Sequence, residues 1–520
     1  MPARRLTTTA LLGALLGLVF LQAFLSMRRK SLTYDELAYI PAGYSYVRTG
    51  DFRLNPEQPP LMKLLAGVAL LPLDPRLPLE HESWTAAGEG VANTQWIFAR
   101  AFFEANPQVE RLVLAARVPT VLLTMLLVVG VFLFARALHG PLAGLLAAAL
   151  CAFDPNVLAH GRLATTDLGL TCFTLWAVFA YHRLTRRPTA GRVAFAGAML
   201  GLALLAKFSG LFLLALMPVF AVVLPFVRDG VVAPERWGGG RREAEGAGHV
   251  GDPPGGDGAE ARRRLGWSLV ATGAVVAVAL MVVSLGYLAP GRANLYFRDF
   301  ANVNVNVHAA FPSYFHGTFH EGRIPYYFLA AVLLKTPLAL LILLALRAAA
   351  QVAERERPGA AHILLAAPVL AWLVIISWRA YAIGLRYVLP IYPFLFVYAA
   401  GIATSPWLRR RTVRLAVAAL VAWTAGSSLA AHPHYLPYFN ALAGGPERGI
   451  EWMDDSNVDW GQDLVLLRDF LDETGLEDVY VTPMAEYDPA LYGVRARFLQ
   501  PGEALRRLTS PDPPPGVYAI

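Results

Sequence analysis

Two adjacent carboxylates, Asp35 and Glu36, follow the first long apolar run of the sequence, within the stretch SLTYDELAYI. Charges beside a membrane segment are costly to desolvate, so a pair of them at this position needs a physical reason. Either the acids face water and cap a helix, since Asp and Glu favour helix N-termini, or they act on a substrate. Because adjacent residues on a helix point about 100° apart, the two acids are not expected to share one role.

A second group of polar residues lies in the stretch DPNVLAHGRLATTDLGL. Asp154, His160, Arg162 and Asp167 fall there within one short loop and the first turn of the next helix. An acid at the depth of Asp167 is uncommon in a membrane segment and is therefore a candidate for function. The alternative is that Asp167 caps the helix, whereas Asp154 before Pro155 is interpreted as a turn residue.

Basic residues are expected to reach the same face of the membrane. Lys207, Lys335 and Arg386 interrupt or flank apolar runs, and Lys335 lies well inside its run, where it needs an anionic partner. Snorkelling or solvation in a loop is the alternative for any one of them. The segment NPEQPPLMKLL adds Glu57 and Lys63, which its Pro-Pro turn and apolar helix would hold near the membrane surface. Several cations at one interface are what binding of a phosphate-bearing lipid requires.

The composition indicates which class of protein carries these residues. The chain has 520 residues, of which 56% are hydrophobic and 16% charged, and its mean hydropathy is +0.45. Soluble proteins carry about 25% charged residues. The net charge is +7, but Lys and Arg are spread over loops, so membrane topology explains them better than nucleic acid binding. Cys151 and Cys172 lie in or beside apolar runs and predict neither a disulfide nor a metal site.

Apolar runs of roughly 17–25 residues can cross a bilayer, and they predict an all-α polytopic membrane protein with about eleven transmembrane helices. We expect the spans near residues 7–26, 112–134, 140–153, 165–182, 193–206, 208–227, 266–289, 324–346, 362–378, 386–404 and 412–431. The first run lacks a small-residue cleavage site and is interpreted as a retained anchor. Arginine crowds alternate connecting loops, which the positive-inside rule assigns to the cytoplasm. The protein is therefore expected in the cell membrane, with loop 27–111 extracytoplasmic.

Two segments outside the spans have distinct compositions. The Gly-rich, charged stretch at 229–264 shows no periodicity and predicts a disordered cytoplasmic linker. The spans and their loops make a transmembrane module over residues 1–431. In the tail, 432–520, a helix beginning near Leu464 and the strand-like stretches EDVYVTP, ARFLQ and GVYAI predict a small extracytoplasmic α/β domain.

The ordered set of these motifs resembles a known family. An acidic pair after the first span, a Pro-Pro segment in a long first outer loop and an Asp in the second outer loop are similar to the GT-C membrane glycosyltransferases of glycosyltransferase family 39, the protein O-mannosyltransferase and aminoarabinose-transferase type. The further matching stretches are KFSGLF, YYFLAAVLLKTPLALL, RYVLPIYPFLFVY and HYLPYFNALAGGPERGIEWMDDSNVDWGQDL. Together the matches cover most of the chain. The Arg- and Ala-rich composition adds the expectation of a bacterial cell-envelope enzyme.

The resemblance implies transfer of a sugar from a polyprenyl-phosphate carrier to an acceptor glycan, lipid or protein on the extracytoplasmic face. Asp35 then takes the position of the catalytic acid that activates the acceptor hydroxyl, with Glu36 beside it, and Asp167 takes the second acidic position. A divalent cation is left open as a cofactor, with Asp35 and Asp167 as its candidate ligands. The candidate substrate-binding residues are Glu57, Lys63, Arg162, Lys207, Lys335 and Arg386.

The competing class is a polytopic transporter or flippase for a lipid-linked or anionic substrate. Transporters tend to show inverted repeats, interrupted helices and charges near the membrane midplane. This sequence shows no internal repeat, and its charged residues favour one face. A non-catalytic membrane scaffold is a second alternative, which the clustered acids and cations disfavour.

Overall fold

Runs of Leu, Ala and Val fold here into helices, because inside a bilayer every backbone N–H and C=O must find its partner within the protein. The computed structural model describes residues 2–87, 93–232, 257–288, 293–306, 312–477, 479–482, 484, 487–499 and 517–519. Its helices are α1 (Pro2–Met27), α2 (Tyr34–Thr49), α3 (Leu61–Leu70), α4 (Glu82–Thr85), α5 (Thr94–Glu104), α6 (Val109–His139), α7 (Pro141–Ala152), α8 (Pro155–His160), α9 (Thr166–Arg186), α10 (Ala190–Ala206), α11 (Phe212–Val223), α12 (Asp257–Gly286), α13 (Ala293–Asn306), α14 (Tyr327–Lys335), α15 (Leu338–Ala353), α16 (Ala360–Arg379), α17 (Tyr392–Ala400), α18 (Arg411–Ala431), α19 (Gly449–Trp452) and α20 (Leu464–Thr474).

The long apolar helices confirm a polytopic membrane protein. Among the described residues, six helices are long and apolar enough to cross a membrane. They are Leu6–Met27, Val109–His139, Phe208–Phe226, Glu260–Gly286, Ala360–Trp378 and Arg411–Ala431. The count rises to seven when α14 and α15, which meet at 105°, are taken as one broken span.

The predicted number of about eleven spans is not confirmed. The expected spans at 140–153 and 193–206 form α7 and α10, which have 12 and 17 residues. At 1.5 Å per residue, a 12-residue helix reaches about 18 Å, well short of the roughly 30 Å of a hydrocarbon core. The expected span at 386–404 is divided between 3₁₀ turns and α17, at a point where prolines interrupt the helix. α9 has 21 residues but is too polar to qualify.

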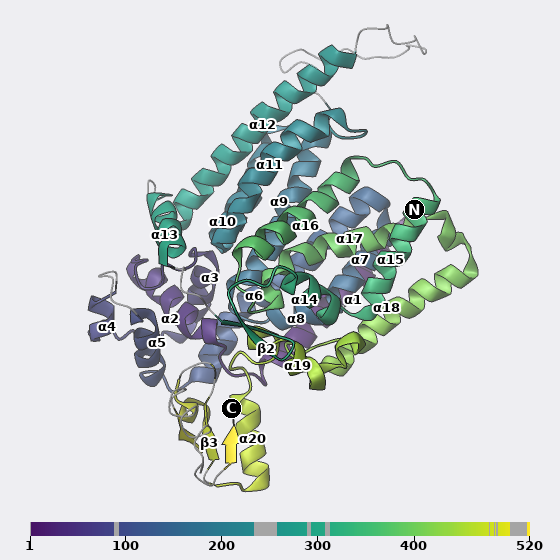
Figure 1. The fold of residues 1–520 in the computed structure, drawn as a ribbon. Coiled ribbons are helices and arrows are strands. Elements are labelled where there is room, and N and C mark those ends of the chain that lie inside the picture. The colour runs from purple at the N-terminus through teal and green to yellow at the C-terminus, as the bar shows by residue number, and fades with distance from the viewer. Residues whose placement is uncertain are drawn as a thin grey trace.

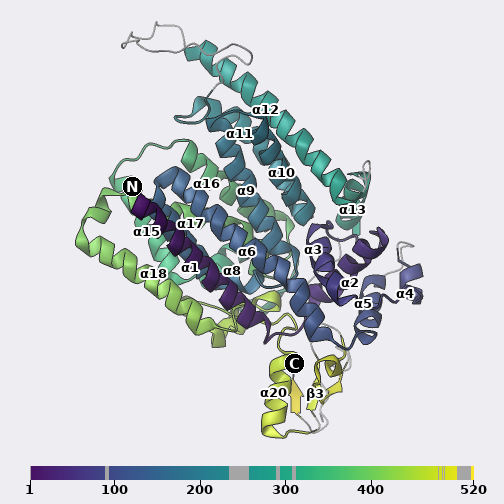
Figure 2. The ribbon, with the colours of Figure 1, turned by 180° about the vertical axis from the view of Figure 1, so that it is seen from behind.

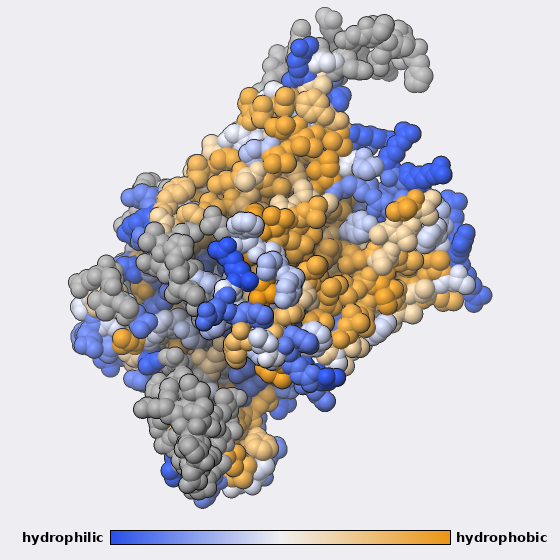
Figure 3. Space-filling view, in the orientation of Figure 1, coloured by the Kyte–Doolittle hydropathy of each residue, from blue (hydrophilic) through white to orange (hydrophobic). Residues whose placement is uncertain are grey.

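The helices form one bundle (Figure 1). α9, α10 and α12 lie side by side along one flank, and α18 packs on α15 along the opposite flank. α1 packs on α6 and α7 and is in full view from behind (Figure 2). Hydrophobic side chains form a broad band over these helices, and hydrophilic side chains gather at the two ends (Figure 3). Such a band with polar ends is what a lipid-embedded bundle requires.

The predicted first outer loop, 27–111, is largely helical and contains α2, α3, α4 and α5. α2 and α3 cross where Gly43 meets Gly67, and a Cβ added to Gly67 would lie 2.2 Å from the carbonyl oxygen of Gly43. Only glycine permits so close a backbone approach. The crossing holds the Pro-Pro segment before α3 against the helix that carries Asp35.

Strands occur in two places in the described chain. β1 (Pro312–Phe315) and β2 (Thr318–Glu321) form an antiparallel hairpin between α13 and α14. In the tail, β3 (Val479–Val481), β4 (Arg497–Phe498) and β5 (Val517–Ala519) form a parallel sheet of order β4-β3-β5. These three strands fall in the stretches predicted to be strands, with α20 preceding them (Figure 1).

Two predicted segments outside the membrane spans fall partly within the described residues. Residues 233–256, most of the linker expected at 229–264, lie outside the described residues, whereas residues 257–264 begin α12. The segment 432–463, which is predicted to belong to the C-terminal domain, contacts the chain where α1 connects to α2. The N–H of Tyr34 donates to the carbonyl of Trp460 at 2.9 Å, and that of Ser31 donates to the carbonyl of Gln462 at 2.8 Å. The separate tail domain remains a prediction.

Candidate active site

Asp35 begins α2, and its carboxylate faces the short 3₁₀ helix η4 (Leu385–Tyr387) that precedes α17. Arg386 donates from Nη1 to Asp35 Oδ2 at 2.6 Å. The two side chains are only 8% and 17% exposed for Arg386 and Asp35, so water screens the contact little. Charge-assisted hydrogen bonds of this length are about twice as strong as neutral ones. The pair therefore fixes the first outer helix against a turn more than 300 residues later in the chain.

The guanidinium of Arg386 also lies on two aromatic rings. Its central carbon is 4.1 Å from the ring centroid of Trp460 and 5.3 Å from that of Tyr387. The buried Nε of Arg386 has no hydrogen-bond partner in the part of the chain that the structure describes. Arg386 thus holds one carboxylate and keeps donor capacity for a second anion.

A second ion pair contacts the same tyrosine. Asp167 lies in the first turn of α9, and Lys207, at the end of α10, donates to Asp167 Oδ1 at 2.6 Å. The Lys207 ammonium lies 4.5 Å from the ring centroid of Tyr387. The other oxygen, Asp167 Oδ2, is buried and without a partner among the described residues. The structure therefore brings four predicted site residues together around Tyr387.

Tyr39 follows Asp35 by one helical turn and is 7% exposed. Burial raises the pKa of Tyr39, the charges of Asp35 and Glu57 raise it further, and Arg386 opposes the shift. Tyr39 therefore remains a neutral hydroxyl near acidic groups at neutral pH. The sequence interpretation missed Tyr39, Tyr387 and Trp460, because an aromatic residue in an apolar chain is no more costly to bury than its neighbours.

Glu57 reaches the site region from the Pro-Pro segment. Gln95 on α5 donates from Nε2 to Glu57 Oε1 at 2.6 Å, and Asn55 contacts the same Gln95 side chain. Burial raises the pKa of Glu57, the hydrogen bond from Gln95 opposes this shift, and the charge of Asp35 raises the pKa further. Glu57 is thus held in position from α5.

Glu36 is wholly buried and points away from Asp35. Its Oε1 accepts from Arg117 Nε and the Ala164 N–H, each at 2.8 Å, and its Oε2 accepts from Arg117 Nη2 at 2.6 Å and the Thr33 N–H at 3.0 Å. Although burial opposes ionisation, the Arg117 guanidinium and these N–H groups hold the pKa of Glu36 below its ordinary value. Glu36 therefore positions the start of α2, and both of its oxygens are occupied.

Two lysines predicted to bind substrate, Lys63 and Lys335, donate to oxygens of the protein. Lys63 donates to the carbonyl and side-chain oxygens of Asn55 at 2.6 and 2.8 Å and to the carbonyl of Gln58 at 2.6 Å, so its three donors are used. Burial lowers the pKa of Lys63 to about 7. Lys335 donates to the carbonyls of Leu436 at 3.0 Å and Asn457 at 2.7 Å. Both lysines hold neighbouring loops in place through hydrogen bonds to backbone carbonyl oxygens.

The hydrogen bonds of Lys335 also support the turn that carries Arg386. The backbone carbonyl of Asn457 accepts a hydrogen bond from the Lys335 ammonium. The side-chain Oδ1 of Asn457 accepts a hydrogen bond from the Leu385 N–H at 3.0 Å. Leu385 precedes Arg386 in η4. Lys335 is therefore linked to the site through Asn457 and Leu385 rather than through a free ammonium group.

Arg162 is fully buried, and the charges of Arg117 and Glu36 act on its guanidinium group. None of its three guanidinium nitrogens has a hydrogen-bond partner among the described residues. No contact of Arg162 reaches the Asp35–Arg386 pair in that part of the chain. Its predicted role in substrate binding stays a prediction.

The donor set around Asp35 and Asp167 does not fit a bound divalent cation as it stands. Such cations prefer several carboxylate or carbonyl oxygens around one point. Here one oxygen of Asp35 faces Arg386, and one oxygen of Asp167 faces Lys207. Among the described residues there is no group of three or more His, Cys, Asp or Glu side chains placed to hold a metal ion. The partners of these two acids are therefore the cationic side chains of Arg386 and Lys207.

We expect Glu36→Gln to destabilise the protein strongly. The substitution keeps the shape of the side chain but leaves Arg117 charged and uncompensated in the interior, which costs about 3–5 kcal/mol. Thermal unfolding of the purified protein measures the loss. Glu451→Gln removes a carboxylate from a surface pair with Arg448, whose side chains are 64% and 52% exposed for Arg448 and Glu451, and should shift unfolding little. Equal shifts for the two variants would contradict the structural role of Glu36.

Comparison with known proteins identifies the fold. Residues 109–238 match the family described as dolichyl-phosphate-mannose-protein mannosyltransferase. The chain is similar to ArnT from Cupriavidus metallidurans in the apo state, with a TM-score of 0.52 at 16% identity over 95% of this chain and 86% of that one. No curated protein matches the sequence.

Two further solved structures align over most of this chain. ArnT from the same organism bound to undecaprenyl phosphate has a TM-score of 0.48 at 15% identity, over 97% of this chain and 88% of that one. The apo oligosaccharyltransferase of Archaeoglobus fulgidus has a TM-score of 0.47 at 14% identity, over 94% and 65%. The family match over residues 109–238 and the similarity of the fold to ArnT agree with the resemblance seen in the motifs.

Proposed function

We propose that this protein transfers a sugar from a polyprenyl-phosphate carrier to an acceptor hydroxyl at the membrane face where α2 lies. The observation that carries the proposal is the meeting of two carboxylate–cation pairs, Asp35 with Arg386 and Asp167 with Lys207, against Tyr387. A sugar phosphodiester needs a base for the incoming hydroxyl and cations for the departing phosphate. The matched family takes its name from a mannosyltransferase that uses dolichyl-phosphate mannose, which supports this class of donor.

In the proposed reaction, Asp35 accepts the proton of the acceptor hydroxyl as the acceptor oxygen attacks the anomeric carbon of the sugar. The bond between that carbon and the phosphate oxygen breaks, and polyprenyl phosphate leaves with the electron pair as an anion. Arg386 and Lys207 stabilise the charge on the leaving phosphate. Asp167 holds Lys207 in place, and its unpaired oxygen is available to the sugar or acceptor hydroxyls.

Arg386 links donor binding to the ability of the Asp35 carboxylate to accept a proton. Before the donor binds, the guanidinium holds the Asp35 carboxylate at 2.6 Å. A phosphate that approaches the unpaired edge of Arg386 shares the positive charge between two anions. The Asp35 carboxylate is then held less tightly and can accept a proton from the acceptor. Donor phosphate and base thus compete for one cation, which delays proton abstraction until the donor is present.

We assign the site to the extracytoplasmic side of the membrane. Asp167 begins α9, while Arg183 and Arg186 lie in its last turn. Arg228 and Arg357 line one cavity together with Arg186, and Arg409, Arg410 and Arg411 lie where α18 begins. The positive-inside rule assigns the arginine-rich end to the cytoplasm. The end with Asp35 then faces outward, where a lipid-linked sugar meets a water-side acceptor.

The catalytic assignment is tested by separating turnover from donor binding. Asp35→Asn should lower the transfer rate by a factor of about 10²–10⁴, because the general base is lost, while the donor still binds. Arg386→Gln should weaken donor binding by about one to two decades, since a hydrogen bond to an ionised group contributes roughly 1.5–3 kcal/mol. The purified full-length protein is assayed with a panel of radiolabelled polyprenyl-phosphate sugars.

Asp51→Asn serves as the matched control. Asp51 follows α2 and pairs with the neighbouring Arg53 at 2.9 Å, away from the Asp35–Arg386 contact. Its substitution should leave both rate and donor affinity unchanged. Near-normal turnover of Asp35→Asn would end the assignment of the base, and unchanged donor binding in Arg386→Gln would end that of the phosphate contact.

The orientation is tested with single cysteines and a membrane-impermeant maleimide. The native Cys151 and Cys172 are buried, so background labelling should be low. Glu477→Cys, at an exposed position after α20, should react in intact cells. Gly191→Cys, in the first turn of α10, where an added Cβ meets nothing within 4 Å, should react only after the membrane is opened. The opposite labelling pattern would put Asp35 on the cytoplasmic side.

A further inference from the structure

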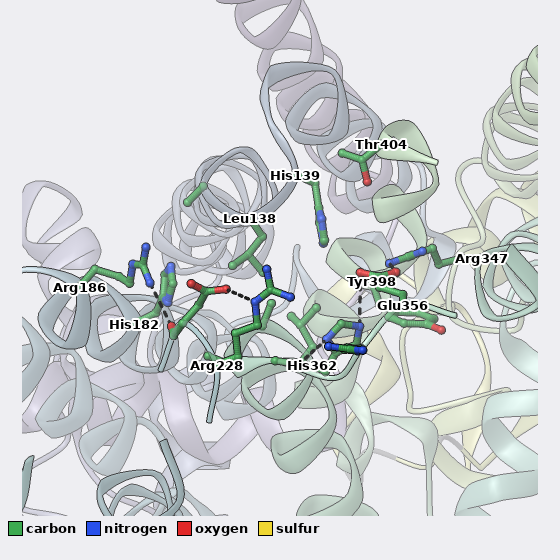
Figure 4. Close-up of a pocket in the computed structure, with 17 residues that line it drawn as sticks. Leu138, His139, His182, Arg186, Arg228, Arg347, Glu356, His362, Tyr398 and Thr404 are labelled. Atoms are coloured by element: carbon green, nitrogen blue, oxygen red, sulfur yellow. Dashed lines mark hydrogen bonds and ion pairs between the residues drawn. The ribbon is translucent and has the colours of Figure 1, made fainter. Parts of the chain in front are cut away.

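A cavity of about 640 Å³ lies at the end of the bundle opposite Asp35 (Figure 4). α6 and α9 connect the two ends. Asp167 begins α9 at the candidate active site and Arg186 ends it at the cavity, roughly 29 Å away at 1.5 Å per residue. The volume falls within the roughly 300–1,000 Å³ of ordinary ligand pockets. None of the acidic or basic residues assigned to the proposed reaction lines this cavity.

The lining of this cavity is basic. Three histidines and four arginines line it, against one aspartate and one glutamate. With the histidines neutral, the four arginines exceed the two acids by two charges. The arginines are Arg186, Arg228, Arg347 and Arg357.

Both acids of the cavity already have cationic partners. Arg347 donates from Nη2 to Glu356 Oε2 at 2.6 Å, and Arg228 Nε lies 3.6 Å from Asp229 Oδ2. Among the described residues, Arg186 donates only to the backbone carbonyl of Asp229, at 3.0 Å. Neither Arg186 nor Arg357 has a carboxylate partner among the described residues. Two guanidinium groups at this cavity are therefore uncompensated.

One buried donor of the cavity has no partner among the described residues. Arg347 is 2% exposed, and its Nε has no hydrogen-bond partner among the described residues. In Figure 4, Arg228 lies in the middle of the cavity, with Arg186 on one side and Arg347 on the other. Buried donors without partners are costly, so the cavity is arranged to receive acceptor oxygens.

We propose that this cavity binds a phosphate group, supplied either by the headgroup of an anionic membrane lipid or by a free phosphate. Guanidinium groups match phosphate oxygens in paired hydrogen bonds, and arginine is the residue suited to such recognition. The cavity lies at one end of the bundle, and hydrophilic side chains gather at both ends of the apolar band (Figure 3). Lipid headgroups lie at these levels of a membrane. Basic pockets between membrane helices are suited to anionic headgroups.

Native mass spectrometry of the purified full-length protein tests the lipid source. The protein is titrated with dioleoylphosphatidylglycerol, and with dioleoylphosphatidylcholine as a lipid without net charge. We expect retention of phosphatidylglycerol over phosphatidylcholine, weakened at least tenfold in the double variant Arg186→Gln and Arg228→Gln. The Arg228 side chain is 74% exposed, so Arg228→Gln alone serves as a second variant that will not unfold the protein. Arg414→Gln, an exposed arginine on α18 outside the cavity, should have no effect.

A parallel arm tests the free source with sodium phosphate alone, read as thermal stabilisation of the same proteins. A ligand that binds only the folded state raises the unfolding temperature. Stabilisation by sodium phosphate that is lost in the double variant, without a preference for phosphatidylglycerol, assigns a free phosphate. Equal binding of both probes by wild type and double variant overturns the proposal, as does binding of neither probe by the wild type. A loss as large in Arg414→Gln would also overturn it, because the effect would then belong to the general charge of this end.

Discussion

Hydrogen bonds of Arg117 join α2 and the end of α1 to α6 of the helical bundle. From α6, Arg117 donates to the carbonyls of Met27, Lys30 and Ser31 at the end of α1, at distances of 2.6–3.1 Å. It also holds both oxygens of Glu36, which in turn caps α2 and accepts from the Ala164 N–H. These partners compensate the buried Arg117 guanidinium, because removing one partner of a buried ion pair is strongly destabilising. The positions of α2, of the loop before α9 and of the end of α1 are therefore set together.

This constraint explains why two adjacent acids behave so differently. With Glu36 directed inward to Arg117, the 100° step of the helix turns Asp35 toward η4 and Arg386. The sequence alone predicted that the two acids would not share one role. It could not predict which acid would be buried, because that depends on Arg117, which lies inside a long apolar helix far along the chain.

Charged residues were found from the sequence because a charge in an apolar chain is costly and stands out. Two ion pairs were found in this way, Asp35 with Arg386 and Asp167 with Lys207, because pairing offsets the cost of burying each charge. The same cost drew attention to Lys63 and Lys335, whose partners are mainly backbone carbonyls, a kind of partner that no sequence pattern reveals. The helical bundle was predicted from hydrophobicity, but the predicted number of about eleven spans is not confirmed. Apolar run length does not show where Gly140 ends α6 or where α14 bends from α15.

In the proposed mechanism, the donor phosphate and the Asp35 carboxylate compete for the Arg386 guanidinium. The affinity of the purified protein for undecaprenyl phosphate, compared between wild type and Asp35→Asn, measures this competition directly. Removal of the carboxylate charge should release Arg386 and tighten binding of the lipid phosphate by about tenfold, equivalent to ~1.4 kcal/mol. An affinity that is unchanged or weaker in Asp35→Asn would contradict the shared use of Arg386.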